Sequence, residues 1–158
     1  EEIIRLLEEF IRRESLEGAV EIVPSWEGVT LSFIDRVLFE SGRADLRGES
    51  RRLLMSLGEL LSGVDNMVRI EGHTDNVPIS NAQFPSNWEL SVYRASTVVR
   101  FLEEQAGLSS ERLSAVGYGE YRPVKPNDTA ENRRRNRRVD LIVLVDEQDE
   151  PSLEILQM

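Results

Sequence analysis

The chain has 158 residues, a hydrophobic fraction of 40% and a formal net charge of −10, which together predict one globular domain with an appended segment. It contains no cysteine, so disulfides and thiolate metal sites are excluded, whereas either a reducing or an oxidising compartment remains compatible. No stretch approaches the roughly 20 apolar residues of a membrane span, and the acidic balance argues against general attraction to nucleic acid or to an anionic wall.

The first half of the chain predicts two helices and three strands. Apolar residues recur with helical spacing over 1–13 and again over 49–61, so both stretches are expected to form amphipathic helices. Alternating apolar and polar residues over 28–34 predict a half-buried strand, which would pair with a short strand at 19–23 as a hairpin. Another short apolar strand is expected at 67–71.

A long helix is expected to begin after Ser86. Ser86 and Glu89 have the spacing of a capping box, in which the serine accepts from a free backbone N–H and the glutamate reaches back. Gly107 would end the helix. The apolar stripe expected on this helix consists of Trp88, Val92, Ala95, Val99, Leu102 and Ala106, flanked by Ser91, Val98 and Phe101.

Arg94 lies at the edge of that stripe, where burying an unpaired guanidinium would be costly. Its planar fork suits a carboxylate, and Asp75 stands in the polar loop that follows the strand at 67–71. The spacing is compatible with an internal Arg94–Asp75 salt bridge. It is equally compatible with two charges held apart to bind a ligand of both signs, with Asp75 taking an ammonium and Arg94 a carboxylate.

The rest of the chain predicts a strand at 112–116, a short helix at 128–136 and a strand at 139–145. The last strand is apolar on both faces, which indicates a central position in the sheet. The acidic tail 146–158 is expected to be disordered or to add one helical turn. Strands that alternate with helices predict an α/β fold whose sheet is covered on one face by helices.

Other chemistries have weak support in the sequence. His73 is the only histidine, and without cysteine or ligand spacing it is expected to order its loop rather than bind a metal. The five arginines between 133 and 138 are expected to face solvent, to pair with Glu131 and Asp128 or to order the site, rather than to bind nucleic acid. No nucleophile elbow, triad order or second placed carboxylate supports an enzyme.

Several motifs nevertheless occur in a specific order. The motifs GHTDN (72–76), NWELSVYRA (87–95), GYGEYRP (117–123) and NRRV (136–139) have the order and spacing of the OmpA-like peptidoglycan-binding domain, which the chain resembles over about residues 28–145. Within that family, the segments LFESGRADL (38–46), NVPI (76–79) and FPSNWELS (84–91) are similar to those of the MotB proteins, the peptidoglycan-anchoring stator subunits of the bacterial flagellar motor.

This resemblance implies an OmpA-like two-layer α/β sandwich, with a mixed sheet, helices packed on one face and an added N-terminal helix. It divides the chain into an N-terminal helix and linker (1–27), the peptidoglycan-binding domain (28–145) and the acidic C-terminal tail (146–158). It also implies a ligand, the diaminopimelate stem peptide of peptidoglycan, bound without a cofactor or metal. The family positions for that ligand fall on Asp75, Arg94, Thr74, Asn87, Leu90, Asn136 and Arg137.

The MotB resemblance further implies a non-catalytic anchor rather than an enzyme. MotB proteins carry an N-terminal membrane helix that joins MotA in an ion channel, and no such segment is present in this sequence, which begins with Glu and has no signal peptide. The chain would then be the periplasmic part of an inner-membrane protein, expected to form a homodimer and to bind no nucleic acid. Another OmpA-like anchor, such as a Pal-type outer-membrane lipoprotein or a secretion-system component, and a wall hydrolase are the alternatives.

Overall fold

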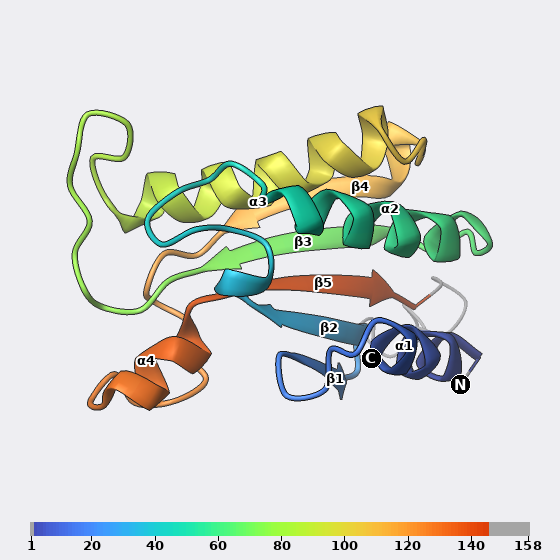
Figure 1. Cartoon of the computed structure of the whole chain (residues 1–158), viewed down its shortest axis with the longest axis horizontal. Helices are drawn as coiled ribbons and strands as arrows, with labels where there is room; N and C mark the ends of the chain where they lie inside the picture. The colour runs from blue at the N-terminus through green and yellow to red at the C-terminus, as the bar shows by residue number, and fades with distance from the viewer. Residues whose placement is uncertain (1, 146–158) are drawn as a thin grey trace, which may run out of the picture.

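The computed structural model describes residues 2–145, which form four helices and a five-stranded sheet (Figure 1). The helices are α1 (Glu2–Arg13), α2 (Gly48–Ser62), α3 (Asn87–Glu104) and α4 (Ala130–Asn136). The strands are β1 (Val20–Pro24), β2 (Gly28–Ile34), β3 (Val68–His73), β4 (Leu113–Gly117) and β5 (Arg138–Leu144), with short 3-10 helices at Asp35–Val37 and Ser110–Arg112. The prediction for the tail 146–158 lies outside the described residues.

The sheet has the strand order β1-β2-β5-β3-β4 and is mixed. Its pairs are antiparallel except for β3 and β4, which run parallel. The predicted hairpin is confirmed, because β1 pairs along its whole length with β2, from Val20 opposite Phe33 to Pro24 opposite Val29. The central position of β5 is also confirmed, and every residue from Arg138 to Val143 is buried.

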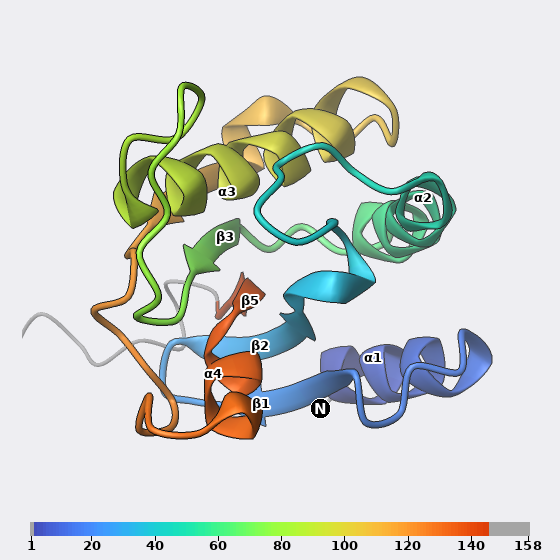
Figure 2. The same ribbon diagram turned by 60° about the vertical axis from the view of Figure 1, so that its left-hand side comes forward.

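Three helices cover one face of the sheet, as Figure 2 shows for α1, α2 and α3. The main core joins apolar side chains of these helices to the inward-facing residues of β2, β3 and β5. Leu7 and Phe10 of α1 are completely buried in this core. The predicted two-layer α/β sandwich with an added N-terminal helix is therefore confirmed. The proposed boundary between residues 27 and 28 stays a prediction, although α1 and β1 both pack with the rest of the domain.

The N-terminal cap predicted for α3 is present, since the Ser86 hydroxyl accepts a hydrogen bond from the backbone N–H of Trp88. Glu89 accepts from the Ser86 hydroxyl. The C-terminal end also follows the prediction: Gly107 adopts φ +78°, and the next N–H, from Leu108, bonds the carbonyl of Leu102 at 3.0 Å. The left-handed backbone at Gly107, which glycine adopts readily, turns the chain back so that this bond with the helix end can form.

The predicted apolar stripe of α3 is partly wrong. Trp88 and Val92 are exposed, whereas the small residues Ser91 and Ala95 are completely buried. The cause is the close approach of the helix to β3: a Cβ added to Gly72 would lie 2.1 Å from the carbonyl oxygen of Ser91. Small side chains therefore face the sheet where α3 crosses Gly72, whereas the larger Trp88 and Val92 stay about half exposed.

This contact predicts a large cost for adding a methyl group to the strand. Gly72→Ala is expected to lower the free energy of unfolding by about 1–3 kcal/mol or more, because the Cβ would overlap backbone atoms that cannot move independently. Gly48→Ala at the start of α2 is the matched control, since its Cβ would meet nothing within 4 Å. Urea denaturation of both variants checks this, and equal stability of the two would contradict it.

Candidate functional site

The candidate site lies at the end of the sheet where β2 and β3 end and β5 begins (Figure 1). Arg138, the first residue of β5, pairs with the last residue of β2 and with the last residue of β3. Asp35, Asp75 and Arg137 stand one or two positions beyond these paired residues. Strand register therefore gathers three charged residues from distant parts of the sequence.

A cavity of about 310 Å³ opens beside this end of the sheet. Six of the seven predicted site residues line it: Thr74, Asp75, Asn87, Leu90, Arg94 and Arg137. The remaining lining residues are Asp35, Ser41, Gly42, Val77, Pro78 and Ile79. The cavity is thus bounded by the loop before α2, the loop after β3, the start of α3 and the residue before β5.

Asp75 is held in place through both carboxylate oxygens. Oδ1 accepts a hydrogen bond from the backbone N–H of Val77 at 2.9 Å, an Asx-type turn that fixes the start of the loop. Oδ2 accepts from Nη1 of Arg137 at 2.7 Å. A ligand ammonium that reaches Asp75 must therefore share this carboxylate with Arg137 or displace it.

Arg94 does not form the internal salt bridge with Asp75 that its position in the sequence allowed. Its Nη1 donates instead to Oδ2 of Asp35 at 3.0 Å, while Nε and Nη2 donate to the backbone carbonyls of Arg43 and Glu40. The guanidinium carbon lies 4.9 Å from the ring centre of Phe39. Arg94 is only 3% exposed, and this burial lowers the pKa of its guanidinium despite the neighbouring Asp35 carboxylate.

The four charged side chains alternate in sign through the site. The distances are 2.7 Å from Asp75 to Arg137, 3.9 Å from Arg137 to Asp35 and 3.0 Å from Asp35 to Arg94. Asp35 is 2% exposed, and its Oδ1 has no hydrogen-bond partner in the structure of residues 2–145. Asp35 is a site residue that was not predicted. The signal was an acidic residue directly after the apolar strand at 28–34.

Three predicted residues shape the wall of the cavity. The Asn87 amide donates to the carbonyls of Asp75 and Val77 at 3.4 and 3.1 Å, which ties the loop after β3 to the start of α3. The Thr74 hydroxyl donates to the carbonyl of Asp75 at 2.8 Å. Leu90 is buried in a small apolar cluster with Ala44 and Phe84. These contacts hold the loop and leave the charged groups to face the cavity.

Asn136 is the one predicted site residue that does not line the cavity. It is completely buried. Its side-chain oxygen accepts from the backbone N–H groups of Val124 and Lys125, and its amide donates to the Lys125 carbonyl and to Asn127. Asn136 therefore ties the loop before α4 to the end of that helix. Because Asn136 directly precedes Arg137, these bonds also fix the backbone next to the cavity.

His73 lies on the sheet face opposite the covering helices, as part of a charge network. Its Nε2 is 3.1 Å from a carboxylate oxygen of Glu71, and its ring stacks on Tyr118. Burial acts to raise the pKa of Glu71, but hydrogen bonds with His73 and Arg69 outweigh it and keep that pKa below its usual value. Glu71, His73 and Asp140 could offer three metal ligands, yet the nearby arginine guanidiniums already neutralise both carboxylates.

The arginines of the cluster at 133–138 occupy different environments. Arg137 lines the cavity, and Arg138 is buried with its Nε 3.2 Å from Asp140. Arg134 and Arg135 lie at the surface, 3.9 and 3.5 Å from the carboxylate of Glu131. The cluster therefore does not present one continuous basic face of the kind that binds nucleic acid.

Comparison with known proteins adds to this geometry. The OmpA family model matches residues 38–137. Motility protein B of Bacillus subtilis is 43% identical over 141 residues, which cover 87% of this chain and 53% of that protein. The chain spans about half the length of the first curated relatives that it matches. In residues 2–145, no helix has both the length and the apolar character needed to cross a membrane.

Two solved structures share the fold. The periplasmic domain of Helicobacter pylori MotB superposes with a TM-score of 0.77 and 26% identity, covering 87% of this chain and 87% of that chain. The cell wall anchor of the T6SS from Pseudomonas aeruginosa superposes with a TM-score of 0.80 and 33% identity, covering 87% of this chain and 96% of that chain. The family match over residues 38–137 and these relatives show that the chain belongs to the OmpA family.

Proposed function

We propose that this chain is a non-catalytic peptidoglycan-binding anchor of a flagellar motor stator. The observation that carries the proposal is the 310 Å³ cavity with Asp75 and Arg137 on its wall, because it presents both signs of charge to a small ligand. The similarity to motility protein B supports the stator assignment. The resemblance between the chain and a periplasmic MotB domain supports a periplasmic location.

The side-chain end of diaminopimelate carries one ammonium and one carboxylate, which matches this arrangement. Asp75 would accept the ammonium. The carboxylate would be bound by Arg137, whose side chain is 34% exposed, together with the N–H groups of Arg94 that its three hydrogen bonds leave free. Binding then exchanges partners: the ligand ammonium replaces Arg137 at Asp75, and Arg137 turns to the ligand carboxylate.

A catalytic role has less support. Acyl transfer needs a nucleophile beside a base, but the only histidine bonds Glu71 and stacks on Tyr118. The hydroxyl of Thr74 in the cavity donates a hydrogen bond to a backbone carbonyl and not to a base. Asp35 and Asp75 are both held by arginines, an arrangement that suits binding rather than general acid catalysis.

The similarity to motility protein B also supports two protein partners. In the full-length protein, a segment outside this chain would anchor it in the inner membrane and contact MotA, and two copies would form a homodimer. A second candidate is an anchor of another system, either a secretion-system component or a Pal-type outer-membrane lipoprotein. The similarity to the T6SS cell wall anchor supports this second candidate.

Co-sedimentation with purified sacculi tests the proposed binding. The chain is expected to pellet with sacculi and to be released by free stem tripeptide that contains diaminopimelate. The supernatant should contain no soluble muropeptides after prolonged incubation. If the chain stays in the supernatant, the proposed wall-binding role is wrong. Release of muropeptides would show that the chain is a hydrolase.

A domain exchange separates the two kinds of anchor. The chain would replace the matching part of Bacillus subtilis motility protein B, to which it is 43% identical. Restored swimming would support the stator assignment. A stable chimera that binds the wall but leaves the cells immotile would favour the other anchoring systems.

A further inference from the structure

A pair of exposed aromatic rings stands beside the cavity. Trp88 at the start of α3 and Tyr121 in the loop after β4 stack with ring centroids 5.0 Å apart and planes inclined by 28°. Trp88 is 47% exposed and Tyr121 is 63% exposed. A contiguous exposed aromatic surface of this kind marks a binding site more often than isolated apolar residues do.

Both rings pack against Gly119. Gly119 adopts φ +60°, and a Cβ placed there would lie 3.5 Å from an atom of each ring. Its N–H donates to the Ser91 hydroxyl at 3.0 Å, and its carbonyl accepts from the N–H of Thr74 at 2.9 Å. The aromatic surface is thereby fastened both to α3 and to the loop that forms the cavity.

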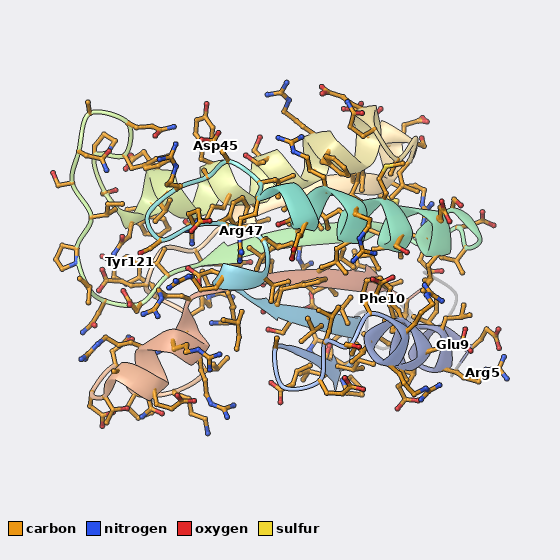
Figure 3. The ribbon with its side chains drawn as sticks, in the orientation of Figure 1. Arg5, Glu9, Phe10, Asp45, Arg47 and Tyr121 are labelled. Carbon is orange, nitrogen blue, oxygen red and sulfur yellow. The ribbon has the colours of Figure 1, made fainter. Side chains whose placement is uncertain are left out.

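The aromatic pair and the cavity are neighbours through two direct connections. Thr74, which bonds Gly119, lines the cavity. Asn87, which precedes Trp88 in the chain, also lines it. Figure 3 places Tyr121 at the end of the molecule where β3 ends and the loop after it begins. A ligand in the cavity that continues toward this end would meet the two rings.

We propose that the Trp88–Tyr121 pair binds a sugar ring of the peptidoglycan glycan strand, an N-acetylated hexosamine, while the cavity holds the stem peptide attached to it. This inference rests on the proposed function. A pyranose ring has an apolar face of C–H groups, and the negative faces of aromatic rings attract such polarised hydrogens. Glu120 and Arg122 flank Tyr121 in the chain and can bind the sugar hydroxyl groups.

The geometry of the ligand fits two adjacent subsites. The diamino acid is the third residue of the stem, and an extended peptide spans at most about 3.5 Å per residue. The stem between the sugar and this residue is therefore short, and a subsite for the sugar is expected on a surface that adjoins the cavity. The Trp88–Tyr121 pair adjoins the cavity through Thr74, which bonds Gly119, and through Asn87, which precedes Trp88.

Two ligands that differ only in their sugars distinguish binding at the aromatic pair from binding in the cavity. Affinity would be measured for a disaccharide tripeptide and for the same tripeptide without sugars, using the parent chain, Trp88→Ala and Tyr121→Ala. Each variant is expected to bind the disaccharide tripeptide about 3- to 10-fold more weakly and the tripeptide unchanged. Tyr93→Ala is the matched control, because Tyr93 is also on α3 and 54% exposed but does not stack on Trp88.

A spectroscopic signal tests the same contact without removing the rings. The chain has two tryptophans, so Trp26→Phe leaves Trp88 as the only one. Its emission is expected to shift with the disaccharide tripeptide and not with the tripeptide. Tripeptide binding without any sugar-dependent change in affinity or emission would overturn this inference and leave the proposed function intact. Failure to bind either ligand would overturn both.

Discussion

Asp75→Asn is expected to bind sacculi about 10- to 100-fold more weakly than the parent chain, because hydrogen bonds to charged groups contribute about 1.5–3 kcal/mol. The amide keeps the shape of the side chain and can still accept from the N–H of Val77, as Oδ1 of the carboxylate does. It cannot balance the charge of a ligand ammonium. The fold should therefore survive while binding is lost, which co-sedimentation and urea denaturation together would show.

Asp45→Asn is the matched control for this experiment. Asp45 lies on the loop between β2 and α2 (Figure 3), its side chain is 74% exposed, and its nearest cation is Arg43 at 3.7 Å. The substitution removes the same charge outside the cavity, so binding should stay near the parent value. Equal losses from both variants would attribute the effect to net charge and would reject Asp75 as a contact.

Local patterns in the sequence are sufficient to predict most of the backbone. Alternation over 28–34 marks β2, because one face of that strand packs on the helices and the other does not. The continuous apolar run over 139–145 marks the central strand β5, which is buried along nearly its whole length. Ser86 marks the start of α3, since its hydroxyl accepts from a backbone N–H of the first turn. Each signal depends only on residues close in the chain.

The partners of the charged side chains could not be predicted in this way. Arg94 bonds Asp35, 59 residues earlier, and Asp75 bonds Arg137, 62 residues later. A buried guanidinium at position 94 needs a carboxylate, and either aspartate could supply it. The position of each aspartate depends on strand register: Asp35 directly follows the last residue of β2, which pairs with the first residue of β5, and this long-range pairing cannot be inferred from the residues around Arg94.

The orientation of α3 depends on tertiary structure for a similar reason. Periodicity places Trp88 and Val92 on the apolar stripe, but only the close packing of the helix against Gly72 shows that small residues must face the sheet. The exposed Trp88 that results is the residue that the sugar subsite uses. The difference between prediction and structure thus coincides with a candidate functional surface.

The largest effect on stability is expected from Asp35→Asn. The substitution leaves the guanidinium of Arg94 buried with its two backbone carbonyl acceptors but without a carboxylate at 3.0 Å. Removing one partner of a buried ion pair typically costs about 3–5 kcal/mol, because the remaining charge is not compensated. The free energy of unfolding in urea is expected to fall by an amount in this range.

Glu104→Gln on α3 is the matched control. It also converts the carboxylate partner of an arginine to an amide, but the Arg100–Glu104 pair is exposed, with an N···O distance of 3.4 Å, and such pairs contribute about 0–1 kcal/mol. A loss below about 1 kcal/mol for Asp35→Asn would show that the carbonyls alone hold Arg94. A loss of about 3–5 kcal/mol would show that Asp35 holds Arg94 in place, and with it the loop at the back of the cavity whose carbonyls Arg94 bonds.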